Sequence, residues 1–379
     1  MTAKVAVCDV CDFMDRWAPP EWAYSWDKPG LHTGNPQQPV ERILACLTVT
    51  PAVVKTAFKN NISMIVSHHP LIWDPIKTLR SDIPQNKLYL DLCSANIACF
   101  SVHTNMDIAP DGVNAALAEK LHLQETRVLF RENHLRQVKL ITFVPEAHQK
   151  SLLHALADAG AGIIGDYTHC SFNISGTGTF LPGKTSNPFT GKRGVINEEP
   201  EIRLEIVVDK AKLPHVLAAL HRTHPYEEPA FDIITLENTN ANLGLGLQGI
   251  LKAPMKLHDF AQHVRCQLSL PYVIVHGRAK QAVRSVAIIG GSGGGFIKRM
   301  PDTVDAYVTG DIGYHDAEEA RMKDLSCIDA THYGTEQPII ESIAKRLHRA
   351  FPTLKIRTYK EKQGTTALTS SVPRHRQDQ

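Results

Sequence analysis

Three short segments combine histidine with a second histidine or a carboxylate, and each follows an apolar run typical of a buried strand. They are Ser67-His68-His69-Pro70, His103-Thr104-Asn105-Met106-Asp107 and His332-Tyr333-Gly334-Thr335-Glu336. Imidazole and carboxylate groups together suit first-row divalent cations. Because open parallel sheets bind ligands beyond the carboxyl ends of their strands, we expect the segments to meet at one site. Together they could supply five ligands, too many for a closed tetrahedral zinc site but suited to two metal ions that share a bridging carboxylate or water.

Each segment also has a structural interpretation. In a continuing strand His68 and His69 would point to opposite faces, so both serve one site only if the strand has ended, which Pro70 favours. Otherwise they are surface or hydrogen-bonded histidines. Asp107 alone is more typical of a helix or turn cap. Glu336, preceded by a natural N-cap at Thr335, would lie in the first turn of a final helix and interact with its dipole.

A glycine-rich segment, Gly290–Gly295, follows a further predicted strand. Its backbone N–H groups could approach a phosphate, which makes Gly290, Gly291, Ser292 and Gly293 candidate substrate-binding residues. The segment has neither the spacing of a dinucleotide fingerprint nor the Lys-Ser/Thr of a P-loop, and a tight packing turn is the alternative.

Alternating strands and helices flank a middle region with a different pattern of predicted elements. Strands are expected at Arg42–Thr50, Ser63–Ser67, Ile97–Val102, Val286–Ile289, Ala306–Val308 and Ser326–Asp329, with helices between them. This order is typical of βαβ units and a largely parallel sheet. The middle region runs strand, helix, strand, helix, as in a compact α+β insert. We therefore predict an α/β domain formed by residues 1–124 and 244–379, an inserted α+β domain over 125–243, and a disordered polar tail over 366–379.

The composition excludes several classes of partner. The 379 residues carry 41 Lys plus Arg against 39 Asp plus Glu, a net charge of +2, without the basic excess that duplex nucleic acid or an anionic membrane attracts. No apolar run approaches the roughly 18 residues of a membrane span. Eight cysteines scattered over so long a chain are typical of reduced thiols. We expect a cytoplasmic protein that binds neither membrane nor nucleic acid.

At these motifs the sequence resembles the dinuclear-metal-centre family of GTP cyclohydrolase 1 type 2, which includes the YbgI-like and YqfO-like bacterial proteins. The resemblance covers nearly the whole chain. The matching segments are Asp27–Gly34 (DKPGLHTG), Val66–Trp73 (VSHHPLIW), Val102–Asp107 (VHTNMD), Gly290–Gly294 (GGSGG) and Thr331–Glu336 (THYGTE). One departure is Thr48, since many members have Asp in a strand reading L-D-x-T.

The resemblance implies two divalent ions per chain, of zinc, iron or manganese, bound by His68, His69, Asp107, His332 and Glu336. It also implies a homohexamer and, from Gly160–Tyr167, Gly176–Phe180 and His224–Ala230, a ferredoxin-like insert of the PII/CutA type. The implied activity is metal-dependent hydrolysis of a nucleotide. Water would attack the imidazole carbon of GTP and open the ring toward formate release, with Glu336 or His103 as proton carriers. A non-catalytic metal-binding or ligand-sensing hexamer is the alternative.

Overall fold

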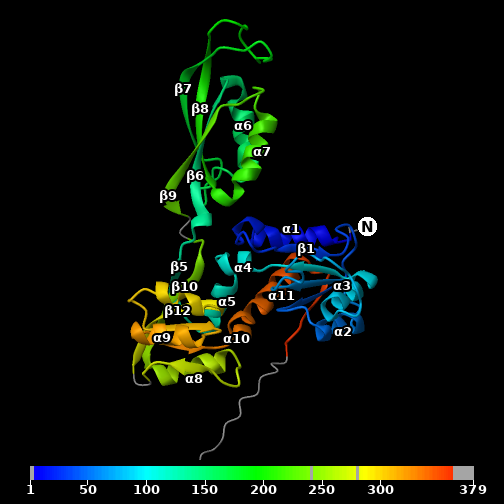
Figure 1. The fold of residues 1–379 in the computed structure, drawn as a ribbon, viewed down its shortest axis with the longest axis vertical. Coiled ribbons are helices and arrows are strands. Elements are labelled where there is room, and N and C mark those ends of the chain that lie inside the picture. Colours follow the sequence, from blue (N-terminus) through cyan, green and yellow to red (C-terminus); the bar gives the residue numbers. More distant parts are fainter. Residues whose placement is uncertain (1–3, 240–241, 279–280, 362–379) are drawn as a thin grey trace, which may run out of the picture. The chain divides into compact units, whose positions relative to one another are not determined.

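The chain divides into two compact units (Figure 1). Unit 1 combines Met1–Phe130 with Leu245–Gln379, and unit 2 is Arg131–Gly244. The structure, a computed structural model, describes residues 4–239, 242–278 and 281–361. The tail predicted over 366–379 lies outside this described part. Within the described residues, none of the helices has the length and apolar character needed to cross a membrane.

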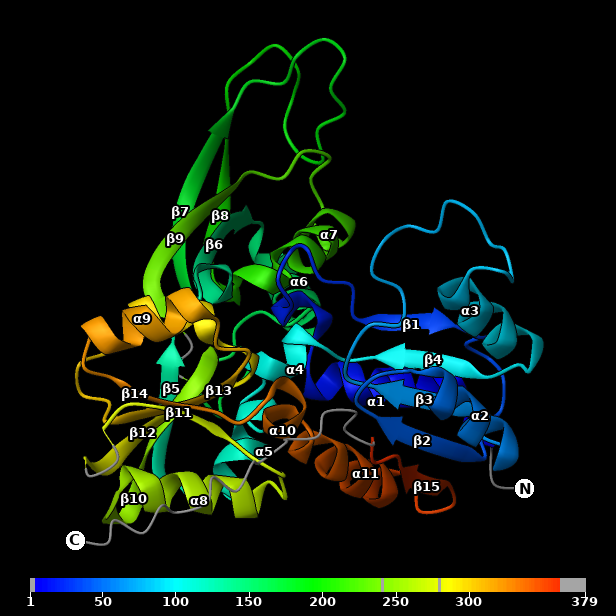
Figure 2. The same ribbon diagram turned by 60° about the horizontal axis from the view of Figure 1, so that its bottom comes forward.

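The first sheet of unit 1 has five strands in the order β1-β4-β3-β2-β15. Their bounds are Gly30–Thr33 (β1), Arg42–Cys46 (β2), Met64–Ser67 (β3), Ala98–Ser101 (β4) and Lys355–Thr358 (β15). Four of them run parallel, and only β1 is antiparallel to its neighbour β4. Figure 2 shows β1, β4, β3 and β2 side by side. The carboxyl ends of β3 and β4 therefore meet at one edge of the sheet.

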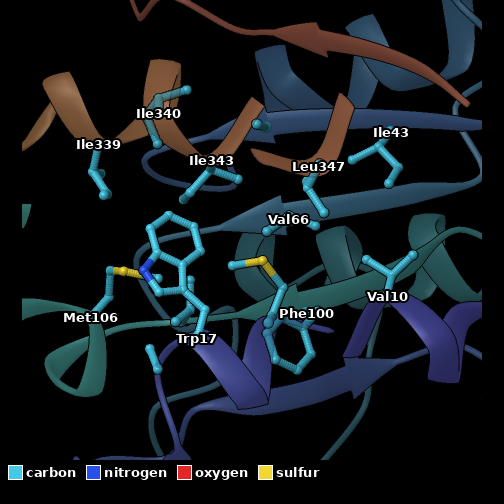
Figure 3. Close-up of a cluster of buried hydrophobic side chains, with 14 of the residues drawn as sticks. Val10, Trp17, Ile43, Val66, Phe100, Met106, Ile339, Ile340, Ile343 and Leu347 are labelled. Atoms are coloured by element: carbon cyan, nitrogen blue, oxygen red, sulfur yellow. The ribbon is translucent and has the colours of Figure 1, made fainter. Parts of the chain in front are cut away.

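Helices cover both faces of this sheet, because its central strands are apolar at successive positions. Val66 and Phe100 pack with α1 (Val7–Trp17) and α11 (Pro338–Ala350), as Figure 3 shows. The alternate residues Ile65 and Cys99 pack with α2 (Pro51–Lys59) and α3 (Pro84–Ser94). Full burial of each large apolar side chain contributes about 1.5–3 kcal/mol to the free energy of unfolding. The strands that lead to the histidines therefore belong to a stable core.

The second sheet of unit 1 has six strands in the order β11-β14-β13-β12-β10-β5. Their bounds are Gln124–Phe130 (β5), Leu245–Lys256 (β10), Ile274–His276 (β11), Ala282–Ser292 (β12), Ala306–Gly310 (β13) and Ser326–Asp329 (β14). Strands β12, β13 and β14 are parallel and the others pair antiparallel. Helices α5 (Val113–Lys120) and α8 (Leu257–Gln267) pack through Leu117 and Phe260 on one face, and α9 (Tyr314–Met322) packs through Ala320 on the other.

Unit 2 contains an antiparallel sheet with the strand order β7-β8-β6-β9. The strands are Arg136–Val144 (β6), Ser171–Phe180 (β7), Asn197–Asp209 (β8) and Phe231–Thr239 (β9). Helices α6 (Glu146–Asp158) and α7 (Leu213–Thr223) bury Leu152 and Leu220 against Leu140 and Ile206 of this sheet. Short 3-10 helices in the chain are Pro20–Trp22, Asn133–Leu135, Lys210–Lys212 and Gly294–Arg299.

The mixed α/β class is confirmed, whereas two details of the predicted organisation are wrong. Unit 1 has two sheets rather than one. Residues 125–130, predicted to belong to the insert, are part of strand β5 of unit 1, because the backbone of β5 pairs with β10 and brings Phe130 opposite Leu245. The boundary therefore lies at residues 130–131 on the first side and 244–245 on the second.

Candidate metal centre

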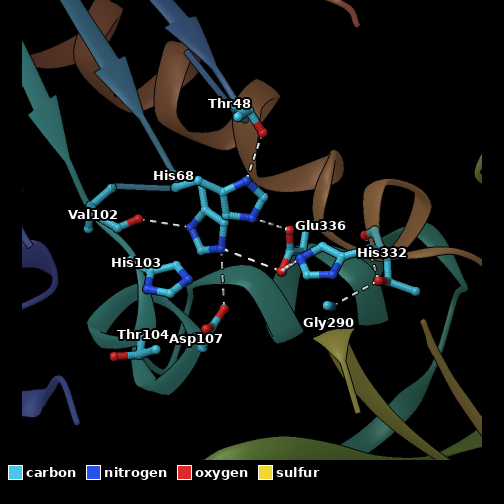
Figure 4. Close-up of polar contacts among 12 residues, drawn as sticks. Thr48, His68, Val102, His103, Thr104, Asp107, Gly290, His332 and Glu336 are labelled. Atoms are coloured by element: carbon cyan, nitrogen blue, oxygen red, sulfur yellow. Dashed lines mark hydrogen bonds and ion pairs between the residues drawn. The ribbon is translucent and has the colours of Figure 1, made fainter. Parts of the chain in front are cut away.

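The strand ends of both sheets in unit 1 converge on one cluster (Figure 4). His68 and His69 directly follow β3, and Asp107 lies in the short helix α4 (Thr104–Ile108) after β4. His332 begins and Glu336 ends helix α10 (His332–Glu336), which follows β14. All five predicted donors are brought together. Because β3 ends at Ser67, both histidines turn toward the same carboxylate, that of Glu336.

His68 is completely buried and its protonation is fixed by its surroundings. Its Nδ1 lies 2.8 Å from the carbonyl oxygen of Val102, which can only accept, so Nδ1 carries the hydrogen. Burial lowers the pKa of His68 to about 4, so the ring is neutral at pH 7. The Nε2 atom then presents a lone pair and has no hydrogen-bond partner.

Two carboxylate oxygens face this lone pair. His68 Nε2 lies 3.6 Å from Asp107 Oδ1 and 3.7 Å from Glu336 Oε1. Asp107 Oδ1 is also buried without a hydrogen-bond partner, and burial together with the charges of Glu336 and Asp27 raises the pKa of Asp107 well above its ordinary value. When Asp107 is ionised, three acceptor atoms face one another, an arrangement that a cation between them would stabilise.

Glu336 lies at the centre of the cluster. Its Oε2 is 2.9 Å from His69 Nε2 and its Oε1 is 3.1 Å from His332 Nε2. Burial alone would raise the pKa of Glu336, but its contacts with the imidazoles of His332 and His69 hold it well below the ordinary value. His332 gains correspondingly: its hydrogen bond to Glu336 raises the pKa of His332 to about 9.

The ligand atoms are close enough to hold a metal ion. Those of His69, His332 and Glu336 lie within 4.8 Å of one another, and the same holds for His68, His69 and His103. His103 therefore borders the predicted ligands directly. Its Nδ1 lies 3.0 Å from Asp27 Oδ1, and Asp27 Oδ2 accepts hydrogen bonds from Thr104 N and Oγ1 at 3.0 and 2.6 Å. Although burial opposes it, these contacts hold the pKa of Asp27 at about 2, so Asp27 is a fixed anion behind His103.

The local structure around Glu336 differs from the prediction. Thr331, rather than Thr335, caps the helix, since its side chain accepts a hydrogen bond from Gly334 N. Glu336 is the last residue of α10, and α11 begins only at Pro338, so Glu336 does not lie in the first turn of the final helix. The hydroxyl of Thr335 instead accepts from Gly291 N at 2.9 Å.

Sequence reasoning missed two carboxylates. Asp311 Oδ2 lies 2.7 Å from His332 Nδ1 and fixes that ring from behind, and Asp27 does the same for His103. Asp311 directly follows β13, so the strand-end signal used for the other donors also applied to it. Asp27 begins the first of the matching motifs, but nothing in its spacing pointed to His103.

The glycine-rich segment serves packing more than binding. Gly290 N donates to Asn114 Oδ1, Gly291 N to Thr335 Oγ1 and Gly293 N to Gly310 O. A Cβ atom on Gly291, whose φ is +74°, would lie 2.2 Å from Glu336 Oε1. These three donors are therefore unavailable to a phosphate, and the geometry favours the packing turn, although Gly290 and Ser292 do line the adjacent cavity.

Thr48 contacts the centre despite its departure from the family pattern. Its Oγ1 lies 2.8 Å from His69 Nδ1, and its N–H donates to Glu361 Oε1 at 2.8 Å. A hydroxyl thus supports the His69 ring at the position where the family resemblance implies a carboxylate.

A cavity of about 1210 Å³ opens beside the cluster. Its lining includes His69, His103, Asp107, His332 and Glu336, together with Tyr24, Trp26, Trp73, Lys77, Ile289 and Phe296. The candidate metal centre therefore forms part of the wall of a space large enough for a nucleotide-sized ligand.

The chain is similar to several known proteins. A "GTP cyclohydrolase 1 type 2 homolog" of Bacillus subtilis is 36% identical over 348 residues, 92% of this chain and 93% of the relative. One of Halalkalibacterium halodurans is 34% identical over 350 residues, 92% and 94% of the two chains. The crystal structure of a Bacillus cereus protein related to NIF3 is similar with a TM-score of 0.78 and 34% identity, and the match covers 97% of this chain and 100% of that one.

The family described as Duf34/NIF3 (NGG1p interacting factor 3) matches residues 5–364, nearly the whole chain. With this match and relatives above 30% identity along more than nine-tenths of their length, the chain belongs to the Duf34/NIF3 family.

Proposed function

We propose that the chain is a metal-dependent hydrolase with a two-metal centre that acts on a nucleotide, opening the imidazole ring of GTP with release of formate. The observation that carries the proposal is the set of facing acceptors, His68 Nε2, Asp107 Oδ1 and Glu336 Oε1. Two of these atoms are buried without a partner. Such an arrangement is costly in a protein core unless a cation joins it. The name shared by the curated relatives supports GTP as the substrate to test first.

The donor chemistry fits divalent cations. Two or three imidazole nitrogens and two carboxylates suit zinc, iron or manganese, and availability decides among these metals. Glu336, which contacts His68, His69 and His332 through its two oxygens, is the side chain best suited to bridge two ions. Asp311 and Thr48 would hold His332 and His69 in their binding orientations from behind.

Bound divalent cations would supply Lewis acidity and lower the pKa of a water molecule to about 7, which makes hydroxide available at neutral pH. Ring opening by one water breaks one C–N bond of the imidazole carbon and leaves a formamide, and a second water must hydrolyse that formamide to release formate. In each step the departing nitrogen needs a proton. His103 would donate it, because the Asp27 carboxylate lies 3.0 Å from its Nδ1 and its ring lies in the cavity wall. Glu336 is less suited to carry protons, since His69 and His332 already occupy its two oxygens.

Metal analysis and product analysis test the proposal in sequence. Wild-type protein should hold two divalent ions per chain and release formate from GTP. His68→Ala combined with His332→Ala should hold fewer than one ion and release none. His258→Ala, which removes an exposed histidine of α8, should match the wild type in both. Fewer than one ion in the wild type would reject the centre, whereas two ions without formate would reject GTP as substrate but not metal-dependent hydrolysis.

A second candidate is a ligand-sensing protein in which unit 2 binds the effector. A cavity of about 680 Å³ in unit 2, lined in part by Phe180, Phe189, Arg203 and Tyr226, favours it. The order β7-β8-β6-β9, with α6 and α7 on one face, supports a ferredoxin-like fold of the PII/CutA type for this unit. An effector that binds this cavity without being consumed would favour the sensing function.

We also propose that the protein is a cytoplasmic homohexamer. The family resemblance supports the hexamer, and eight free cysteines support a reducing compartment. Light scattering of the purified chain should give about six times the 42.0 kDa of one chain.

A further inference from the structure

We propose that Tyr24, Trp26 and Trp73, the aromatic wall of the cavity, form the subsite that recognises the planar ring of the substrate. This inference rests on the proposed function, because it names the group that selects a heteroaromatic substrate for the metal centre. No role in metal binding or proton transfer accounts for these three side chains.

The three rings form one continuous stack. The ring centroids of Tyr24 and Trp26 are 5.8 Å apart with an interplanar angle of 6°. Those of Trp26 and Trp73 are 6.2 Å apart at 19°. Near-parallel, offset rings of this kind offer the same geometry to an added aromatic ring. All three line the cavity, yet Trp26 is 58% and Trp73 53% exposed, so their indoles are accessible to a ligand.

Only the imidazole ring of His103 separates the aromatic wall from the metal ligands. His103 contacts Trp73 and Trp26 edge to face, with centroid distances of 5.2 and 6.1 Å. On its other side the His103 centroid is 5.3 Å from that of His68 and 5.8 Å from that of His69. A heterocycle stacked on the wall would therefore reach His103 and the centre with its edge, where a ring-opening reaction has to occur.

Hydrogen bonds fix the segment that carries Trp26 before any ligand arrives. Tyr24 N donates to Thr104 Oγ1 at 3.2 Å, and Lys28 N donates to Asp27 Oδ1 at 2.8 Å. Asp27 in turn accepts from Thr104, which begins the helix of Asp107. The segment that carries Tyr24 and Trp26 is thus attached to the same short helix as Asp107. Such preorganisation reduces the ordering cost of binding.

The rest of the lining suits the remainder of a nucleotide. Lys77 lies in the same segment as Trp73, between β3 and α3, and lines the cavity as a cation available to an anionic group. Exposed indoles also occur at contacts between protein subunits. A parallel stack inside a concave cavity, shared with the metal ligands and a lysine, is better matched to a flat anionic heterocycle, and the test separates the two.

Calorimetry with two probes tests the subsite in the metal-loaded full chain. Guanosine carries the ring without phosphates, and tripolyphosphate carries the charge without the ring. Trp26→Ala and Trp73→Ala should each weaken guanosine binding by about 5- to 150-fold, the usual cost of losing one stacked base, and leave tripolyphosphate binding within about twofold. Trp73→Phe should restore most of the guanosine affinity, whereas Trp73→Leu, which keeps the bulk, should not.

Phe58→Ala is the matched control, since it removes a 43% exposed aromatic side chain from α2, which contributes no residue to the cavity lining. It should change neither affinity. Retained tripolyphosphate binding shows that a variant is folded. Unchanged guanosine binding in both alanine variants, or no guanosine binding by the wild type, would overturn the subsite. So would a changed oligomeric mass with unchanged guanosine affinity, which would assign the wall to a subunit contact.

The formate assay tests the proposed hydrolase activity independently of the ring-binding subsite. Guanosine binding that depends on Trp73 without formate release from GTP would support the subsite and reject the hydrolase, and formate release without any dependence on the two tryptophans would do the reverse.

Discussion

Glu336 is almost completely buried, yet its carboxylate lies within 3.7 Å of three imidazoles. The five donors could be predicted from the sequence because their side chains carry the chemistry themselves. Their supporting groups could not, since an aspartate acquires such a role only through contacts. Asp27 bonds Thr104, 77 residues away, and Asp311 bonds His332, 21 residues away. Residue types therefore reveal the ligands, whereas only the fold reveals what orients them.

The hydroxyl of Thr48 provides a test of this orienting effect. Thr48→Val keeps the shape of the side chain but removes the contact with His69 Nδ1, so the ring loses its fixed orientation. We expect metal affinity to fall by about 10- to 100-fold, as is usual when the partner of a ligating histidine is lost. Competition with a metal-binding dye measures the change. Thr48→Ser, which keeps the hydroxyl, should stay within about threefold of the wild type, and equal losses in both variants would exclude the hydrogen bond as the cause.

Among the elements, the buried strands were predictable, whereas three of the edge strands in unit 1 were not. Strands β2, β3, β4 and β14 are apolar runs between turn residues, which is the pattern that burial on both faces imposes. Strand β5 is largely exposed, with the sequence QETRVLF, and its pairing partner β10 lies more than 100 residues later. Strands β1 and β15 are short and also lie at sheet edges. Their strand character depends on a neighbour, which local patterning does not contain.

The turn at Gly291 makes a prediction about the element that supports Glu336. Gly291→Ala would place Cβ 2.2 Å from Glu336 Oε1, at a φ of +74° that side chains rarely adopt. We expect the carboxylate to be displaced, metal binding to fall by at least tenfold, and stability to drop by about 1–3 kcal/mol. Metal titration and urea unfolding measure the two effects. Gly295→Ala, whose Cβ would meet nothing within 4 Å, should leave both unchanged. Normal metal binding by Gly291→Ala would show that Glu336 has another stable position.

Helix α1 contains an unfavourable charge. Burial and the neighbouring charges of Glu21 and Asp12 raise the pKa of Asp15 to about 6, and its Oδ1 is buried without a partner. Because the folded protein holds this proton more tightly than the unfolded chain, the contribution of Asp15 to stability falls as the pH rises from about 4 to about 6. Above that range the full penalty applies. Since the side chain is partly exposed, we discount the penalty to about 1–2 kcal/mol.

Asp15→Asn should therefore stabilise the protein, and by more at pH 8 than at pH 5. Urea unfolding at the two pH values measures the difference, and the exposed Asp302→Asn serves as control with no expected change at either. A stabilisation that is the same at both pH values would mean that packing, rather than charge, explains the effect.

At the scale of the whole molecule, the candidate metal centre belongs entirely to unit 1, although its ligands come from both sides of unit 2 in the sequence. Unit 2 leaves and re-enters unit 1 at Phe130 and Leu245, which are direct partners in the antiparallel pair β5–β10. The strand pairing of unit 1 thus continues up to the point of insertion. This is how an insert can be accommodated without disturbing the sheet that hosts it.

Unit 1 should consequently retain its metal centre without unit 2. Removing residues 131–244 and joining Phe130 to Leu245 through Asn-Gly would close β5 and β10 with a two-residue type I′ turn, the preferred connection of such a hairpin. We expect the shortened chain to fold and to bind as many metal ions as the full chain, because every proposed ligand and every orienting partner is retained.

The same deletion with His68→Ala and His332→Ala should bind none at the centre. Metal analysis then decides the issue: a folded, shortened chain without metal would mean that unit 2 is required to complete the centre. If metal and formate release both persist while the oligomeric mass falls, unit 2 serves assembly, and hydrolysis is a property of unit 1 alone.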